Sequence, residues 1–149
     1  MEDGLVSIIT SSYNSEQYIA RLIESVIAQT YTNWELLITD DCSTDNTLEV
    51  ALDFERKYPD KIVVLKNERN LGLNATLNKC LAVTEGKYIA RMDADDICLP
   101  DRFEKQFKFM EENPDVDLSS CRFMTVKNGV YKSGGAGGRC DNDAIRAML

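Results

Sequence analysis

The strongest constraint on the fold is an alternation of short apolar strands with helical patterns. Runs rich in Ile, Val and Leu occupy residues 5–10, 34–39, 61–66 and 87–92. Between these runs, apolar residues recur three and four positions apart, which indicates amphipathic helices. Strands that alternate with helices form βαβ units, in which neighbouring strands are parallel. The sequence therefore predicts an α/β fold with a mostly parallel sheet and helices on both faces.

Capping and helix-breaking residues set the bounds of the predicted helices. The first predicted helix begins at Asn14 or Ser15, and the second begins near residues 43–45 and ends before Pro59. The third ends after Ala82, and the fourth starts at Pro100 and ends before Pro114.

The last part of the chain has a different pattern. The sequence predicts a fifth strand over residues 116–126 and a hairpin turn at Asn128-Gly129. Residues 133–140 are rich in glycine, and residues 141–149 begin a capped helical pattern that stops early. We therefore expect a folded core over residues 1–132, followed by a flexible loop and the start of a truncated helix over residues 133–149.

The composition narrows the classes of function. The chain has 149 residues and a formal net charge of -8, without a run of Lys and Arg, so we expect no nucleic-acid binding. It contains no histidine, which excludes Ser-His-Asp catalysis, Cys-His catalysis and His-ligated zinc within this chain. The five cysteines form no CxxC pair and suit free thiols in a reducing compartment. With no signal peptide and no membrane-spanning run, the sequence predicts a cytoplasmic protein.

Three polar clusters follow predicted strands at their carboxyl ends. They lie at residues 11–14, at Asp40-Asp41 and at residues 93–96, and together they place five carboxylates on one rim of the sheet. Ligands of open α/β sheets bind at this rim. Each cluster alone has an ordinary structural explanation, such as a turn, a helix cap or a loop. Their coincidence predicts a binding site.

The acidic cluster at residues 93–96 needs a counter-charge, because neighbouring carboxylates repel one another. In an extended backbone, Asp93 and Asp95 point to the same side, and the small Ala94 between them lets a ligand approach the backbone. Carboxylates without histidine or paired cysteine favour Mg²⁺ or Mn²⁺, which also take water and phosphate oxygens as ligands. The sequence therefore predicts that a divalent cation joins Asp93 and Asp95 to a diphosphate.

Other ligand-binding motifs fit this cluster less well. The chain has no GxxxxGK[ST] and no GxGxxG. Ile97 and Cys98 stand where an EF-hand loop counted from Asp93 needs a ligand and a glycine. A sugar nucleotidyltransferase would need a glycine- and arginine-rich loop after the first strand, and the stretch "SSYNSEQY" that follows this strand does not supply one. A receiver-type domain, which holds Mg²⁺ at an acidic rim and is phosphorylated on an Asp, stays open as the alternative, although its acidic pair is expected after the first strand.

Four stretches of the chain carry a resemblance to a known family. In order, they are "VSIITSSYN", "WELLITDDCSTDNT", "NERNLGLNATLNKCL" and "GKYIARMDADDICLPDRFEKQ". This ordered set closely resembles the family-2 inverting glycosyltransferases of the GT-A fold, over residues 4–126. The resemblance implies that the core over residues 1–132 binds a nucleotide-sugar.

The resemblance implies roles for the first two polar clusters. Ser11, Tyr13 and Asn14 match the loop that lines the nucleotide pocket in this family. Asp41, or else Asp40, matches the carboxylate that accepts a hydrogen bond from the base, typically from uracil N3–H.

The resemblance also implies roles for later residues. The stretch from Asn70 to Asn78 looks like the loop and helix that pack beside the nucleotide and the sugar. Asp93 matches the first acid of the DxD motif, near the ribose and the metal, and Asp95 matches the direct metal ligand. Ala94 lies between them.

The activity implied by the resemblance is a metal-dependent, inverting transfer of a sugar from a nucleotide diphosphate donor, UDP-sugar above all. The acceptor would be a glycan or a lipid-linked molecule, as in polysaccharide biosynthesis, and the enzyme a hexosyl- or N-acetylhexosaminyltransferase. The general base is expected beyond Leu149, because Asp141 and Asp143 lie in a glycine-flanked loop. We expect this chain to bind the donor with little turnover, and the whole protein to associate with the cytoplasmic face of a membrane.

Overall fold

A computed structural model of the chain describes residues 2–127 and 130–134. The chain divides into two compact units, with the boundary after Glu104. The expected boundary between residues 132 and 133 stays a prediction, because residues 135–149 lie outside the described part. The same holds for the glycine-rich loop and the truncated helix.

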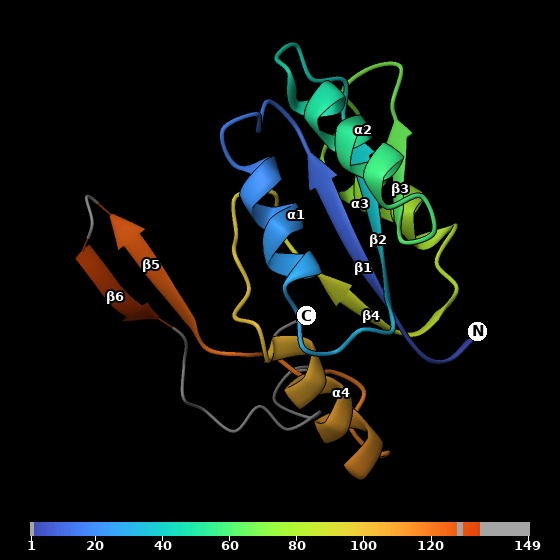
Figure 1. The fold of residues 1–149 in the computed structure, drawn as a ribbon, viewed down its shortest axis with the longest axis vertical. Coiled ribbons are helices and arrows are strands. Elements are labelled where there is room, and N and C mark those ends of the chain that lie inside the picture. Colours follow the sequence, from blue (N-terminus) through green and yellow to red (C-terminus); the bar gives the residue numbers. More distant parts are fainter. Residues whose placement is uncertain (1, 128–129, 135–149) are drawn as a thin grey trace. The chain divides into compact units, whose positions relative to one another are not determined.

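The first unit is built on a parallel sheet, as the alternation of strands and helices predicts. Its four strands are β1 (Glu2–Ser12), β2 (Trp34–Asp40), β3 (Ile62–Lys66) and β4 (Gly86–Arg91). Their order in the sheet is β3-β2-β1-β4, and every neighbouring pair is parallel (Figure 1). The carboxyl ends of all four strands therefore lie at one edge of the sheet.

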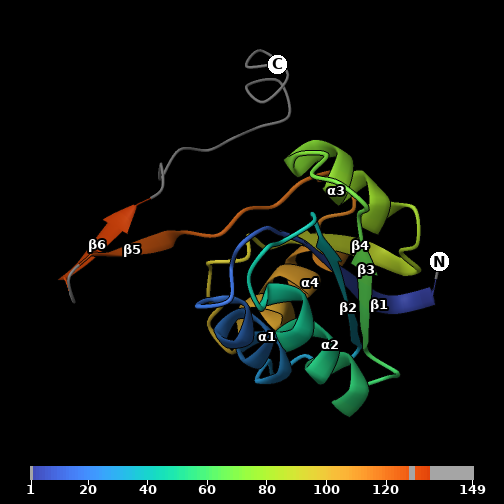
Figure 2. The ribbon, with the colours of Figure 1, turned by 90° about the horizontal axis from the view of Figure 1, so that it is seen from above.

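Helices cover both faces of this sheet, as expected. The helices of this unit are α1 (Ile19–Ile27), α2 (Thr47–Lys57) and α3 (Leu73–Leu81). Helices α1 and α2 pack together on one face, and α3 covers β1 and β2 on the other (Figure 2). The first helix begins at Ile19, later than the predicted start at Asn14 or Ser15, because residues 15–18 form a separate turn in which the Tyr18 backbone N–H donates to the Ser15 carbonyl oxygen.

The core lies between the sheet and the helices. Ile8 of β1 and Leu36 and Ile38 of β2 are fully buried, and α1 adds a buried face that contains Leu22 and Ile23. Strands that are buried on both sides read as continuous apolar runs, which is why β1 and β2 could be located in the sequence.

Gly86 is required where β4 enters the sheet. A Cβ atom at this position would lie 2.6 Å from Ser7 Oγ, 2.7 Å from Ser7 N and 2.8 Å from Leu5 O. Two of these atoms belong to the backbone of β1 and cannot move without disturbing the sheet. We expect Gly86→Ala to lower the free energy of unfolding by about 2–3 kcal/mol in urea titrations. Glu85→Ala, at an exposed position next to it, is the control and should change that free energy by less than about 0.5 kcal/mol.

The second unit contains most of α4 (Arg102–Glu112), a helix that crosses the boundary between the units, and a two-stranded sheet. Strand β5 (Phe123–Lys127) pairs antiparallel with β6 (Val130–Gly134). The predicted strand over residues 116–126 is therefore wrong in its first half, since residues 116–122 are not in a strand. The predicted turn at Asn128-Gly129 lies outside the described residues.

Within residues 2–127 and 130–134, none of the helices combines the length and the apolar character that crossing a bilayer would require.

Candidate functional site

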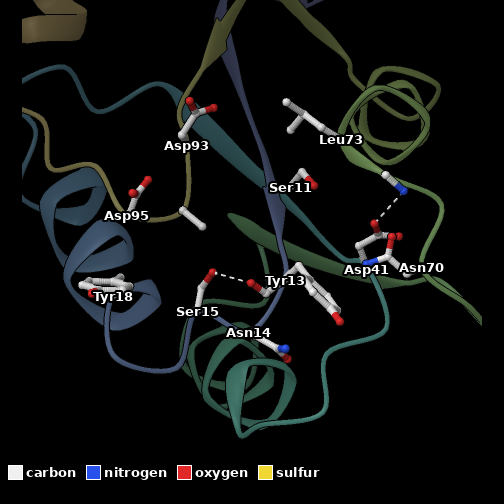
Figure 3. A pocket seen from close by; sticks show the side chains of 12 residues that line it. Ser11, Tyr13, Asn14, Ser15, Tyr18, Asp41, Asn70, Leu73, Asp93 and Asp95 are labelled. Carbon is white, nitrogen blue, oxygen red and sulfur yellow. Dashed lines mark hydrogen bonds between the residues drawn. The ribbon is translucent and has the colours of Figure 1, made fainter.

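A cavity of about 420 Å³ opens at the carboxyl ends of β1, β2 and β4 (Figure 3). The residues that line it are Ser11, Tyr13, Asn14, Ser15, Tyr18, Asp41, Asn70, Gly72, Leu73, Asp93, Ala94 and Asp95. These residues come from the end of β1, from the loops after β1, β2, β3 and β4, and from the start of α3, which are far apart in the sequence. The topology of the sheet brings them together.

The structure gathers most of the residues that the sequence singles out, but two of them lie elsewhere. Asp40 and Asn78 do not line the cavity: Asp40 is buried beneath the loop after β2, and Asn78 lies on an exposed part of α3. Sequence reasoning missed Ser15 and Tyr18, which it assigned to a helix. Their place in the cavity follows from the late start of α1.

Asp41 is held rigidly at one end of the cavity. Its Oδ1 accepts hydrogen bonds from the Leu71 backbone N–H and from Asn67 Nδ2, both at 2.8 Å. Its Oδ2 accepts one from the Gly72 backbone N–H, also at 2.8 Å. An ionised carboxylate has room for about four hydrogen bonds. These bonds occupy three of those positions, on a side chain that is only 2% exposed and lines the cavity.

These contacts keep the Asp41 carboxyl ionised. Burial alone raises its pKa, but the hydrogen bonds from Leu71, Asn67 and Gly72 together outweigh that effect. The net result is a pKa below the ordinary value of 3.8. Asp41 is therefore an acceptor of hydrogen bonds throughout the neutral range, and it cannot donate one there.

Asp40 has a structural role. Its Oδ2 accepts a hydrogen bond from the Ser43 backbone N–H at 3.0 Å, and its Oδ1 accepts one from the Ser43 hydroxyl. The two carboxylates of the Asp40-Asp41 pair therefore serve different purposes: Asp40 fixes the turn that leads to α2, and Asp41 faces the cavity.

The loop after β1 is fastened to the loop after β2. Asn14 Oδ1 accepts a hydrogen bond from the Thr44 backbone N–H at 2.9 Å, and the Asn14 backbone N–H donates to Ser43 Oγ at 3.0 Å. The Ser15 backbone N–H donates to Thr47 Oγ1 at 2.7 Å. Asn14 adopts a left-handed backbone with φ of 48°, which Asn tolerates better than most residues. These bonds fix Tyr13, whose ring is half exposed at the mouth of the cavity.

The acidic loop after β4 is a turn, so the expectation of an extended backbone there is wrong. The Asp96 backbone N–H donates a hydrogen bond to the Asp93 carbonyl oxygen at 3.0 Å, which closes a turn over residues 93–96. Asp93 and Asp95 nevertheless both line the cavity, while Ala94 is buried between them. In Figure 3 the two acids stand at the side of the cavity opposite to Asp41.

Part of the counter-charge for this loop comes from the chain itself. Arg91 Nε and Nη2 donate to the same oxygen of Asp93, Oδ1, at 3.0 and 2.8 Å. Close negative charge is still evident at Asp96, whose pKa is raised by burial and by the neighbouring Asp95 and Asp93 carboxylates. Arg91 therefore shares with the predicted divalent cation the role of counter-charge for this loop.

The carboxylates of the acidic loop suit a divalent cation. No cluster of three or more Asp, Glu, Cys or His side chains suited to a metal occurs in the described part of the chain. Mg²⁺ and Mn²⁺ in nucleotide sites need fewer, since one or two carboxylates together with phosphate oxygens and water complete the shell. The exposed Asp95 carboxylate and the second oxygen of Asp93 fit that requirement.

Comparisons with known proteins agree with this geometry. The model of the family "Glycosyl transferase family 2" matches residues 7–137. EpsE of Bacillus subtilis, which its name describes as a glycosyltransferase, is 46% identical over 108 residues, or 72% of this chain and 39% of EpsE. WfgD of Escherichia coli, a "UDP-Glc:alpha-D-GlcNAc-diphosphoundecaprenol beta-1,3-glucosyltransferase", is 43% identical over 76% of this chain and 44% of WfgD. The chain thus spans less than half of these relatives.

Solved structures share the fold. The crystal structure of Staphylococcus aureus TarS 1-349 in complex with UDP matches with a TM-score of 0.66 and 31% identity, over 73% of this chain and 32% of that TarS fragment. The mannosyltransferase PcManGT of Pyrobaculum calidifontis, in complex with GDP-Man and Mn²⁺, matches with a TM-score of 0.60 and 25% identity, over 66% of this chain and 29% of that one. The parallel sheet with helices on both faces is thus the GT-A fold. The chain belongs to glycosyl transferase family 2.

Proposed function

We propose that the cavity binds a UDP-sugar, with the base at Asp41 and the diphosphate at Asp93 and Asp95. The single observation that carries this proposal is the Asp41 carboxylate, which is buried, ionised and lines the cavity, and to which the proposal assigns a remaining acceptor position for the base. A base that donates an N–H fits this position. Uracil has a donor, N3–H, that suits this position. Cytosine has an acceptor at N3, which would lie opposite the Asp41 carboxylate, itself an acceptor.

The rest of the cavity suits the other parts of the donor. Tyr13 offers an exposed ring at the mouth of the cavity, against which a flat base can stack. Asp93 and Asp95 lie at the side of the cavity opposite to Asp41, where they would hold Mn²⁺ or Mg²⁺. When bound, such an ion neutralises the diphosphate and stabilises the negative charge that develops on it as it leaves. The TarS complexes with UDP and with UDP-GlcNAc, and the UDP-Glc in the name of WfgD, support UDP as the nucleotide.

For the whole protein we propose an inverting transfer of a hexose or N-acetylhexosamine to a glycan or a lipid-linked acceptor. The name of WfgD, which includes a diphosphoundecaprenol acceptor, supports the lipid-linked case. A general base beyond Leu149 would deprotonate the acceptor hydroxyl. Asp141 and Asp143, the weaker candidates for that base, lie outside the described residues. Action in the cytoplasm, at the membrane face, is part of the same proposal.

The alternative of a receiver-type domain is set aside, because the chain belongs to a glycosyltransferase family and its acidic pair follows β2. No contact among the described residues favours phosphorylation of an Asp over binding of a nucleotide.

Calorimetric titration with UDP and CDP, each with and without Mn²⁺, tests the proposal. We expect UDP to bind more tightly than CDP by about 10-fold or more, since CDP would leave the Asp41 acceptor opposite another acceptor. Mn²⁺ should strengthen the binding of both nucleotides, because both carry the diphosphate. Equal affinity for UDP and CDP would refute the assignment of the base site, and an absent effect of Mn²⁺ would refute the metal site.

A further inference from the structure

A chain of hydrogen bonds connects Asp41 with a lysine that lies outside the cavity. Asn67 Nδ2 donates to Asp41 Oδ1 at 2.8 Å and to Thr76 Oγ1 at 3.0 Å. At the other end of the same amide, Lys79 Nζ donates to Asn67 Oδ1 at 3.1 Å. Lys79 also donates to the Lys66 backbone carbonyl, which ties α3 to the end of β3.

The chemistry of the partners allows only one orientation of the Asn67 amide. Lysine can only donate hydrogen bonds, and an ionised carboxylate can only accept them. The Thr76 hydroxyl has a single hydrogen, which it donates to the Gly72 carbonyl oxygen at 2.9 Å. Toward Asn67 it can therefore only accept. If the amide turned over, its oxygen would face Asp41 and its NH₂ group would face Lys79. Asn67 is only 2% exposed, so water has little access to repair such a mismatch.

We propose that Lys79 is a positioning residue for recognition of the base. It fixes the Asn67 amide with the NH₂ group toward Asp41, and Asn67 thereby holds the Asp41 carboxylate with its free acceptor position toward the ligand. This inference rests on the proposed UDP site. Lys79 itself does not line that cavity; it lines a second one, of about 590 Å³, together with Lys66, Asn67, Glu68, Arg69 and Leu71.

The alternative explanation is that Lys79 acts only through its charge or through the packing of α3. A general effect of positive charge would be shared by Lys66, which lines the same second cavity. A loss of packing would weaken every ligand of the nucleotide cavity alike. An effect through Asn67 and Asp41 would instead weaken a ligand that donates to Asp41, and spare one that does not.

The experiment compares Lys79→Met, the matched control Lys66→Met, and the conservative variant Lys79→Arg, which can still donate to Asn67. The affinities for UDP and CDP are measured by displacement of a fluorescent nucleotide in the presence of Mn²⁺. We expect Lys79→Met to lower the affinity for UDP by about 3- to 10-fold, as the loss of one hydrogen bond to a buried network would do. The affinity for CDP should change by less than about 2-fold. Lys66→Met should leave both affinities within about 2-fold, and Lys79→Arg should restore most of the preference for UDP.

The outcomes separate this inference from the proposed function. If the wild-type chain does not prefer UDP over CDP, the proposed base site is refuted. If it does prefer UDP, and Lys79→Met either leaves both affinities unchanged or weakens both equally, the base site stands and the role of Lys79 is refuted. The same conclusion follows if Lys66→Met has as large an effect as Lys79→Met. Lys79 is exposed on α3, so these variants are expected to fold.

Discussion

Asp41→Asn is expected to lower the affinity for UDP by about 10- to 100-fold, which is the range for the loss of a hydrogen bond to a charged group. An Asn side chain has one oxygen in place of two. If that oxygen keeps the bonds from Asn67 and Leu71, the new NH₂ group faces the Gly72 backbone N–H and the N–H of the base. Two donors would then lack an acceptor. The same mismatch should lower the free energy of unfolding by about 2–3 kcal/mol, measured in urea.

The matched control is Asp40→Asn, which makes the same change of charge at the adjacent buried carboxylate. It removes acceptors from Ser43 and should also destabilise the fold, but it should leave UDP affinity within about 2-fold because Asp40 does not line the cavity. The reverse pattern, with UDP lost in Asp40→Asn and kept in Asp41→Asn, would move the base site to Asp40.

Asp41 also makes stability depend on pH. Its pKa is lower in the folded chain than the ordinary value of 3.8, so the folded state holds its proton less tightly than the unfolded state does. Its contribution to stability is therefore fully present above that ordinary value and is lost as the pH falls through the lower, folded value. Thermal melts between pH 7 and pH 3 should show a steeper acid loss in the wild-type chain than in Asp41→Asn.

Strands β1 and β2 could be predicted from the sequence because they are buried on both faces, whereas most residues of β3 and β4 are half-buried or exposed. The predicted runs at residues 34–39 and 87–92 match β2 and β4 to within one residue at each end. Strands that are buried on both faces form continuous apolar runs, and the parallel connections follow from the intervening helices. The short antiparallel sheet of the second unit was harder to locate, because the residues of β5 before Lys127 are exposed and residues 116–122 only resemble a strand in composition.

The polar rim could be predicted only in outline. A strand end fixes which residues reach the rim, but not which of two adjacent acids faces the ligand. The structure separates them by their partners: Asp40 accepts from Ser43, while Asp41 accepts from backbone N–H groups 30 and 31 positions away in the sequence. The role of Ser15 was equally hidden, because its backbone bond to Thr47 joins residues 32 positions apart. Contacts of this kind leave no periodic signal in a sequence.

Asp95→Asn is expected to remove most of the Mn²⁺-dependent part of UDP binding. Arg91 already occupies one oxygen of Asp93, which leaves Asp95 as the less compensated of the two acids. Removing one full charge next to a divalent ion should weaken UDP in the presence of Mn²⁺ by about 10-fold or more, since desolvation offsets only part of the Coulomb attraction. Without Mn²⁺ the affinity for UDP should stay the same or rise, because one negative charge near the diphosphate is gone.

Asp96→Asn is the control for Asp95→Asn, because it removes a negative charge one residue later. It distinguishes an ion bound by Asp95 from an effect of the summed charge of the loop. Asp96 is exposed and does not line the cavity, whereas Asp93 and Asp95 both do. If the acids act only by their summed charge, Asp95→Asn and Asp96→Asn should change UDP affinity equally, with and without Mn²⁺. If Asp95 binds the ion, the difference between the two variants appears only when Mn²⁺ is present, and Asp93→Asn, where Arg91 shares the carboxylate, falls between them.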